Sequence, residues 1–529
     1  MNDEKQTGSY YTPHDVISFM VDYLKTENQD FSKVLEPSAG DGRFLSLLQK
    51  ESKNIVALEI IKEKVKQMKK DYSGDEIKIV QADFLKYALK KKEKYSLIIG
   101  NPPYINPKLM DKESIEKARE ICKAEGIPTT VMQNMWLAFV IGACRLLESN
   151  GTIFFVLPME FLQVQYAEKL RAYLETKFNT IHIISFQKFV FADIEQEVCL
   201  VYLTNKNQQP CILYKIYEDA EQRNTLLLNT IKKNKPLQKW SNAILSDEDI
   251  QLLKEKSSQY KKVEEIGITA PGIVTGGNKC FILEEEKVRT YDCEKYVIPI
   301  LQKSSFIEER TITIDQSVME KIRTKNKPMY LLDLADIEED MLPVKLKEYL
   351  DKEGEKKVSD TDTPLKDRFK CANRKPWYGV PIVKKGEVIF FKRYDILPRI
   401  YINEIDVHTT DAGYHIRLNA GYDKESLVFC FYNSLTLAQC EYHGRYYGGG
   451  VRELVPSEFK RVTIPYREID KKDIEQLESM FREKVSSEQI IQFVNSKTIE
   501  LEMKRAQVKR IESIWRKLVQ RRTEIGNDE

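Results

Sequence analysis

Polar side chains stand at the ends of four short apolar runs in the first hundred residues. They are Glu36, Glu59, Asp83 and Asn101, and Glu59 lies 23 residues after Glu36. A carboxylate at about that distance typically binds ribose hydroxyls, while Asp83 could accept a hydrogen bond from an amino group and Phe84 could stack on a base. Each side chain alone could equally be a helix cap or a turn residue. Four in succession predict one ligand crevice.

A glycine-bearing loop connects the first two of these runs. Residues 34–45 read VLEPSAGDGRFL, so that Gly40 and Gly42 open the following helix and allow the backbone to approach a ligand closely. The loop lacks the third glycine of a dinucleotide site, and no GKS or GKT follows it as in a phosphate-binding loop. We therefore expect neither of these two ligand classes.

The stretch GNPPYI, residues 100–105, places two prolines directly after Asn101. A turn needs one proline at most. Two of them stiffen the chain where a doubly wound sheet opens its ligand crevice.

Strand-like and helix-like patterns alternate from about residue 30 to 205, which predicts a parallel α/β sheet. A polar, helix-leaning insert over 105–134 interrupts this alternation. The stretch 246–465 favours strands and turns, and 468–525 reads as helix. The predicted strands are 33–35, 54–58, 77–80, 97–99, 152–157 and 198–202.

Composition is that of a globular protein, with 42% hydrophobic and 31% charged residues. No apolar run approaches the roughly 18 residues of a membrane span, and the first residues are polar, so we expect neither a membrane segment nor a signal peptide. The nine cysteines form no cluster with histidine at zinc spacing. We interpret them as reduced core residues and predict no metal. The net charge of +2 means that a nucleic acid would need a local basic face.

The motifs together resemble those of the gamma-class DNA adenine-N6 methyltransferases of bacterial restriction–modification systems. The matching stretches occur in the same order as in the family, beginning with a motif that precedes the glycine loop. Phe189–Asp193 resembles the aromatic motif of the family, and residues 272–276 and 444–450 resemble parts of its target-recognition domains. The ordered matches are Thr7–Pro13, Glu36–Gly42, Glu59, Asp83-Phe84 and Asn101–Tyr104.

The resemblance implies a Rossmann-like class I methyltransferase domain with a mixed, mostly parallel sheet. A mixed α+β recognition domain and a helical segment follow it. The implied boundaries are 1–240, 246–465 and 468–529. The implied ligand is S-adenosyl-L-methionine, bound by Tyr11, Thr12, Glu36, Ser38, Gly40, Gly42, Glu59, Ile60, Asp83, Phe84, Asn101 and Pro103.

Under this resemblance the Asn-Pro-Pro-Tyr stretch is catalytic. The lone pair of an adenine amino group is delocalised into the ring, and two acceptors at its hydrogens favour a tetrahedral nitrogen. The side chain of Asn101 and the carbonyl of Pro102 would be these acceptors, held still by the prolines. The base must first leave the duplex. We expect Tyr104 and Phe191 to stack on it, although Phe191 could be a core aromatic.

A basic stretch at residues 366–399 carries ten Lys or Arg residues against three acids, which suits phosphate contacts. A solvated surface is the alternative. The glycine-rich stretch around Arg445 could also approach DNA, or be a flexible loop. The residues expected to bind DNA are Lys370, Arg374, Lys375, Lys384, Lys392, Arg393 and Arg445.

Two other functions remain open at this point. One is methylation of RNA or protein glutamine, and the other is a DNA-specificity module on an inactive methyltransferase fold. The expected protein is cytoplasmic and bacterial, binds double-stranded DNA, and is a monomer or weak dimer. A restriction endonuclease could be encoded separately.

Overall fold

The computed structural model describes residues 11–72, 74–105, 109–187, 198–206, 210–221, 223–232, 237, 239–357, 363–446 and 451–520. Two compact units divide the chain. Unit 1 comprises residues 1–250, 445–450 and 520–525, and unit 2 comprises 251–444, 451–519 and 526–529.

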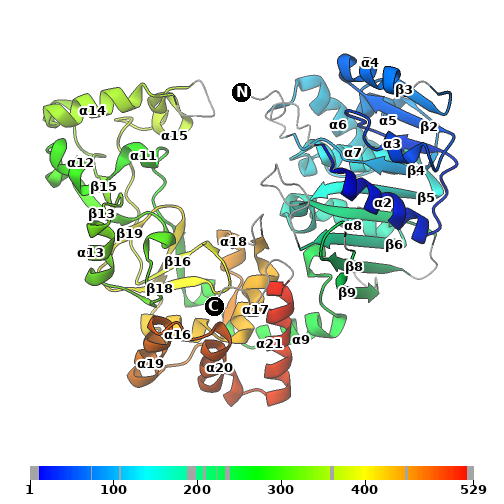
Figure 1. The fold of residues 1–529 in the computed structure, drawn as a ribbon. Helices are drawn as coiled ribbons and strands as arrows, with labels where there is room; N and C mark the ends of the chain where they lie inside the picture. The colour runs from blue at the N-terminus through cyan, green and yellow to red at the C-terminus, as the bar shows by residue number, and fades with distance from the viewer. Residues whose placement is uncertain are drawn as a thin grey trace. The chain divides into compact units, whose positions relative to one another are not determined.

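Unit 1 is built on a nine-stranded sheet with the order β3-β2-β1-β4-β5-β7-β6-β8-β9 within the described residues (Figure 1). The pairs β1–β2, β2–β3, β1–β4, β4–β5 and β6–β8 are parallel, whereas β7 runs antiparallel to β5 and β6. The strands are β1 (Val34–Glu36), β2 (Ile55–Glu59), β3 (Ile77–Gln81), β4 (Tyr95–Gly100), β5 (Leu147–Pro158), β6 (Thr180–Phe186), β7 (Val198–Thr204), β8 (Cys211–Tyr217) and β9 (Thr225–Lys232).

Helices cover this sheet because its central strands are apolar on both faces. Residues of α2, α3 and α4 share one core with every second residue of the strands, such as Val34, Ala57 and Ile99. Helices α5, α6 and α7 pack on one another, and α7 also packs on β5. The helices of unit 1 are α2 (His14–Thr26), α3 (Leu45–Leu48), α4 (Lys62–Asp71), α5 (Phe84–Lys90), α6 (Lys112–Ala124), α7 (Met135–Leu146) and α8 (Glu168–Lys177). Helix α9 (Asp247–Ser257) begins at the end of this unit.

This architecture confirms the predicted fold class: a mixed, mostly parallel sheet, followed by further sheets and C-terminal helices. Each of the six predicted strands corresponds to a strand of the sheet. The sequence prediction missed β6, β8 and β9. In β6, the polar residues Thr180, His182 and Ser185 interrupt the apolar run, although all three are buried.

Unit 2 contains small, mainly antiparallel sheets, with β11-β20-β16-β18-β14 and β12-β15-β13-β19 as the larger two. Their strands are β11 (Gly267–Pro271), β12 (Ile282–Leu283), β13 (Val297–Leu301), β14 (Thr313–Ile314), β15 (Tyr330–Leu332), β16 (Val388–Phe391), β18 (Arg399–Asn403), β19 (His408–Thr409) and β20 (Gly413–Leu418). The pair β10 (Lys261–Lys262) and β23 (Thr463–Ile464) and the pair β17 (Arg393–Tyr394) and β22 (Arg452–Glu453) are shorter.

The described helices of unit 2 range from four residues to the 16 residues of the last one. They are α10 (Val263–Ile266), α11 (Asn278–Phe281), α12 (Glu285–Thr290), α13 (Gln316–Thr324), α14 (Val344–Gly354), α15 (Phe369–Ala372), α16 (Lys424–Phe431), α17 (Ser434–His443), α18 (Pro456–Phe459), α19 (Lys471–Arg482), α20 (Ser487–Lys497) and α21 (Arg505–Gln520).

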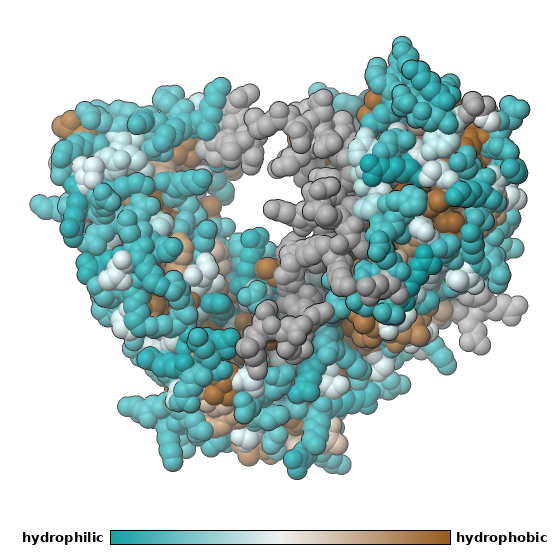
Figure 2. All heavy atoms as spheres, in the orientation of Figure 1, coloured by the Kyte–Doolittle hydropathy of each residue, from teal (hydrophilic) through white to brown (hydrophobic). Residues whose placement is uncertain are grey.

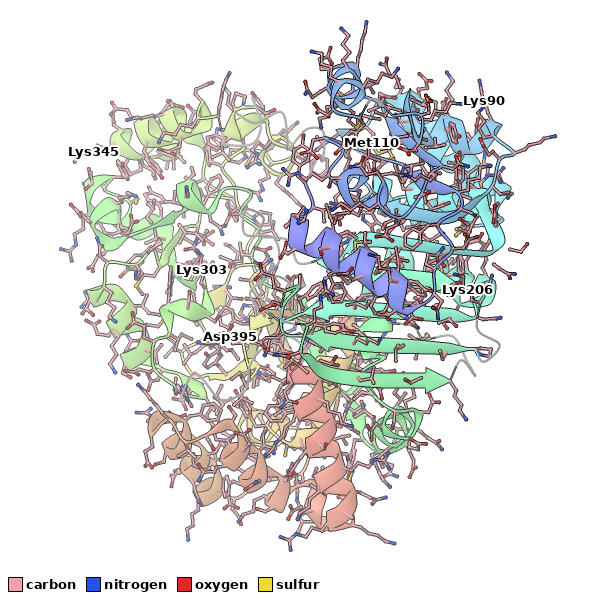
Figure 3. All side chains as sticks on the ribbon, turned by 45° about the vertical axis from the view of Figure 1, so that its right-hand side comes forward. Lys90, Met110, Lys206, Lys303, Lys345 and Asp395 are labelled. Carbon is pink, nitrogen blue, oxygen red and sulfur yellow. The ribbon has the colours of Figure 1, made fainter. Side chains whose placement is uncertain are left out.

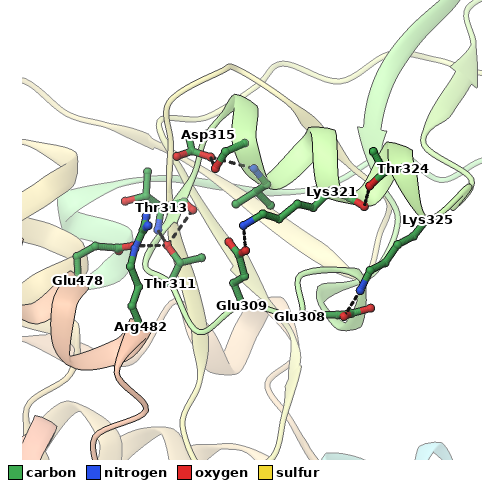
Figure 4. A network of polar contacts seen from close by, with 12 residues as sticks. Glu308, Glu309, Thr311, Thr313, Asp315, Lys321, Thr324, Lys325, Glu478 and Arg482 are labelled. Atoms are coloured by element: carbon green, nitrogen blue, oxygen red, sulfur yellow. Dashed lines mark hydrogen bonds and ion pairs between the residues drawn. The ribbon is translucent and has the colours of Figure 1, made fainter.

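A carboxylate fixes the first C-terminal helix to the strand-rich part of unit 2 (Figure 4). Glu478 of α19 accepts hydrogen bonds from the Thr311 hydroxyl at 2.7 Å and from the Ile312 amide at 2.9 Å. Arg482, one turn later, donates to the same carboxylate at 2.6 Å. The helical segment therefore packs as part of unit 2. No helix in the described part of the chain is long and apolar enough to cross a bilayer.

A buried histidine connects helix α2 to the sheet of unit 1. His182 Nδ1 lies 2.7 Å from the Tyr23 hydroxyl, to which Lys215 also donates at 3.0 Å. Glu27 lies 4.0 Å from the same ring nitrogen. Burial, and then the charge of Lys215, lower the pKa of His182 from 6.5 to about 3. The imidazole is therefore neutral in the folded protein at physiological pH.

We predict that His182 makes unit 1 sensitive to acid. Because the histidine pKa is lower in the folded than in the unfolded protein, stability is fully present above pH 6.5 and is lost as the pH falls toward 3. The unfolding free energy should fall by up to about 1.4 kcal/mol per pH unit from this residue. Denaturation at a series of pH values should show a shallower acid slope for His182→Gln. His14→Gln, at an exposed position, is the control. An unchanged slope in His182→Gln would contradict the prediction.

Candidate functional site

The carboxyl ends of β1, β2, β3 and β4 meet at one edge of the unit 1 sheet and border a cavity of about 320 Å³. Parallel pairing, with Leu35 opposite both Val56 and Ile98, brings these ends together. All four predicted strand-end residues line the cavity. Its lining includes Tyr11, Thr12, Glu36, Ser38, Gly40, Asp41, Glu59, Ile60, Asp83, Phe84, Asn101 and Pro103.

Eleven of the twelve residues predicted to bind the cofactor line this cavity, and Gly42 is the exception. Gly42 has φ +82°, and a Cβ atom there would lie 3.0 Å from the Tyr72 ring and 3.2 Å from Met68. The Tyr72 hydroxyl donates to the Gly42 carbonyl at 3.0 Å. Gly42 is thus required by the packing behind the loop, whereas Gly40, with φ +59°, faces the cavity.

Glu59 holds the glycine loop in place. One carboxylate oxygen accepts from the Gly40 amide and the other from the Ile61 amide, each at 2.8 Å. Each oxygen keeps a second lone pair, so the carboxylate can fix the loop and still accept hydrogen bonds from a ligand.

Asp83 begins helix α5 and is also paired with a lysine that the sequence analysis missed. Its Oδ1 accepts from the Leu85 amide at 2.8 Å, as a helix N-cap does, and its Oδ2 accepts from Lys117 Nζ at 2.7 Å. Lys117 belongs to α6, in the insert that interrupts the strand–helix alternation. Acidic and basic residues alternate along that insert, so spacing alone could not single out Lys117.

Aromatic and aliphatic side chains close the same end of the cavity. The ring of Phe84 lies 4.7 Å from that of Phe139, centre to centre. Met110, labelled in Figure 3, and Leu109 line the cavity from the segment before α6, and Met135 lines it from α7. This end suits a flat, apolar ring with a polar edge.

Glu36 is the most deeply buried carboxylate of the site, with 1% of its surface exposed. Its Oε2 atom has no hydrogen-bond partner among the described residues. Burial, and then the nearby Asp41 and Glu59, raise the pKa of Glu36 well above its usual value. Arg43 and Lys64 also line the cavity, and Arg43 is paired with Asp41 at 2.7 Å. The carboxylate oxygen left for a cationic ligand is therefore Glu36 Oε2.

Asn101 and Pro103 line the cavity, whereas Pro102 and Tyr104 do not. The Ser38 hydroxyl donates to the Asn101 carbonyl at 3.0 Å and so joins this stretch to the glycine loop. The Tyr104 hydroxyl donates to the Val156 carbonyl at 3.1 Å, and burial raises its pKa well above the usual value. That hydroxyl is therefore a fixed anchor for a half-buried ring. Phe191 lies outside the described residues.

The basic residues predicted in unit 2 fall into two groups. Arg374 donates to the carbonyls of Thr275 and Val274 at 2.7 and 2.8 Å, Lys392 lies 3.5 Å from Asp411, and Arg393 lies 3.0 Å from Glu453. In contrast, Lys370, Lys375 and Lys384 are exposed and have no ion pair among the described residues.

Arg445 belongs to unit 1, although the sequence places it far from the sheet. Its neighbour Tyr446, in β21 (Arg445–Tyr446), is held by the buried amide of Gln163. That amide donates to the Tyr446 carbonyl at 2.6 Å and accepts from the Tyr446 amide at 3.1 Å. This pair of hydrogen bonds spans 283 positions in the sequence.

Comparisons with known proteins agree with this geometry. The family model described as Eco57I restriction-modification methylase matches residues 27–191, and the model of the C-terminal domain of the type II methyltransferase M.Eco57I matches residues 237–499. The type II methyltransferase M.AccI of Acinetobacter calcoaceticus is 23% identical over 517 residues, which cover 91% of this chain and 90% of that protein. M.BstVI of Geobacillus stearothermophilus is 21% identical over 348 residues, 53% of this chain and 61% of that protein.

The fold also resembles a solved structure. The type IIL restriction-modification enzyme MmeI, determined in complex with DNA, matches with a TM-score of 0.63 and 13% identity, over 98% of this chain and 80% of that chain. This likeness concerns the fold. The two family models, which together match residues 27–191 and 237–499, show that the chain belongs to the family of type II restriction-modification DNA methyltransferases.

Proposed function

We propose that this chain transfers the methyl group of S-adenosylmethionine to N6 of an adenine that has been flipped out of duplex DNA at one recognised sequence. Residues 1–240 would carry the reaction, 246–465 would recognise the sequence, and 468–529 would support the recognition part. The observation that carries the proposal is a single cavity, bordered by the carboxylates of Glu36, Glu59 and Asp83, that extends to Asn101.

The charge of the cavity fits this cofactor. S-adenosylmethionine carries a sulfonium and an ammonium group, and Glu36 has a buried oxygen without a hydrogen-bond partner among the described residues. Glu59 would bind the ribose hydroxyls through its remaining lone pairs. Asp83 and Phe84 would bind the amino edge and the face of the adenine ring. Asp41 is already paired with Arg43 at 2.7 Å, so Glu36 would be the main carboxylate partner of the ammonium group.

The protein would promote the reaction by fixing the position of the target base. The cofactor supplies an electrophilic methyl group on a sulfonium. Asn101 and the Pro102 carbonyl would accept the two amino hydrogens of the target adenine and so direct the nitrogen lone pair toward that methyl group. The amino nitrogen, held by these two acceptors, would lose one proton to water once it carries the methyl group, and the cofactor would leave as a neutral thioether. The hydrogen bond between Tyr104 and Val156 would keep the stacking ring in place.

Our first prediction for this site concerns the cofactor and pH. Because the Glu36 pKa is raised in the folded protein, its protonated form is favoured there, and its contribution to stability is present at low pH and lost as the pH rises through the raised pKa. The ligand-free Glu36→Gln protein should therefore unfold at a higher temperature than wild type at neutral pH. A cationic ligand requires the ionised form, so wild-type affinity for S-adenosylmethionine should rise with pH, with proton release on binding.

Calorimetry in two buffers of different ionisation enthalpy measures both the affinity and the released proton. Glu36→Gln should bind about 10- to 100-fold more weakly, as expected for the loss of a hydrogen bond to a charged group, with little dependence on pH. Glu63→Gln, at an exposed position on α4, is the matched control. Wild-type affinity and proton release in Glu36→Gln would show that the cationic end binds elsewhere.

The second prediction concerns the reaction. Asn101→Ala should retain binding of cofactor and DNA but lose about 10²–10³ in single-turnover rate, as found for other preorganised hydrogen-bonding groups. Transfer of a tritiated methyl group to duplex DNA, followed by nucleoside analysis, measures both the rate and the methylated atom. Asn54→Ala, an exposed asparagine of unit 1, is the control.

Each outcome of this assay has a distinct meaning. Transfer to N6 of adenine that depends on Asn101 supports the proposal. Transfer to RNA or to protein glutamine in preference to duplex DNA would overturn the substrate class, and wild-type protein that transfers nothing would indicate an inactive fold. A rate for Asn101→Ala within a few-fold of wild type would remove Asn101 from its proposed role.

A further inference from the structure

A large aromatic side chain of unit 2 is exposed on a strongly basic segment. Phe369, the first residue of α15, has 78% of its surface exposed, the most of any large apolar side chain among the described residues. The face of the molecule shown in Figure 2 is mostly hydrophilic. Burying a phenylalanine side chain is favourable by about 1.5–3 kcal/mol, so a ring left in water here is available to a partner.

The neighbours of Phe369 carry positive charge. Residues 368–375 read RFKCANRK and contain four basic residues and no acidic one. Lys370 and Lys375 are exposed and have no ion pair among the described residues. A partner that covers the ring therefore meets a positive surface, which selects a polyanion.

A second exposed apolar side chain is held beside this segment. Arg374 donates to the carbonyls of Val274 and Thr275, and 40% of the Val274 surface is exposed. The loop lies so close that a Cβ atom on Gly276, which has φ +80°, would be 2.9 Å from Lys370 Cβ. Both carbonyls therefore have a hydrogen-bond donor, and any residue other than glycine at position 276 would be strained. These contacts fix the loop against α15, so that Val274 and Phe369 are exposed on neighbouring segments.

We propose that Phe369 is a wedge that enters between base pairs of bound duplex DNA, with Val274 packed against the same strand and Arg374 as the residue that positions both. Insertion of an apolar side chain at a base step partly unstacks it and bends the duplex. This inference rests on the proposed function, and assigns to Arg374 a role inside the protein in place of the phosphate contact that the sequence predicts.

The test compares substitution of Phe369 with substitution of a neighbouring lysine and of another highly exposed apolar residue. Fluorescence anisotropy measures affinity for a duplex that carries the methylated site, over a series of salt concentrations. Phe369→Ala should weaken binding about 10- to 100-fold, the range for loss of aromatic stacking on a base, and leave the salt dependence unchanged. Lys370→Gln should reduce the slope of log affinity against log salt by about one. Met341→Ala, 69% exposed and preceded by three acidic residues, should change neither.

Arg374 provides an independent comparison. If it positions the loop, Arg374→Met weakens binding with the wild-type salt slope, and its effect is not additive with that of Phe369→Ala. A slope reduced by about one would make Arg374 a phosphate ligand. Thermal unfolding of each variant detects loss of folding, and a duplex labelled at both ends reports bending by energy transfer.

The results separate this inference from the proposed function. Wild-type affinity and bending in Phe369→Ala, with normal methylation by the wild-type protein, would overturn the wedge alone. If the wild-type protein binds no duplex DNA, the proposed function and the wedge both fail. If Phe369→Ala instead changes self-association in sedimentation and leaves DNA binding intact, the ring contacts a second copy of the chain and the wedge is wrong.

Discussion

The parallel alignment of β1, β2, β3 and β4 is the constraint on which the site depends. Parallel strands end at the same edge of a sheet, so carboxylates far apart in the sequence are brought around one cavity. Burial, and then the neighbouring charges of Asp41 and Glu59, disfavour ionisation of Glu36 and raise its pKa. A cationic ligand would favour the ionised form of this carboxyl group, so that binding would be coupled to release of its proton.

The other carboxylates of the site are already engaged within the protein. Glu59 holds the glycine loop, and Asp83 caps α5 and pairs with Lys117. A substitution at either position therefore changes local structure together with any ligand contact, since loss of an N-cap alone costs about 1 kcal/mol. Glu36 Oε2 has no hydrogen-bond partner among the described residues. A substitution of Glu36 therefore tests the ligand contact with the least change to local structure.

The sequence predicted the parts of the molecule that depend on local pattern. Apolar runs identified β1 to β5 and β7, and the polar residues at the ends of β1 to β4 line one cavity. It could not predict contacts set by packing. Gly42 is required by Tyr72 and Met68, thirty or so residues away, and Lys117 meets Asp83 only because α6 packs on α5. Charge counting likewise could not separate Arg374, which holds a loop, from the exposed Lys370.

Modified-base sequencing of DNA from a host that expresses this chain tests the proposed adenine methylation most directly. We expect N6-methyladenine at one recurring sequence with the wild-type protein and none above background with Asn101→Ala. Methylation of another atom, or wild-type DNA without any recurrent methylated site, would contradict it.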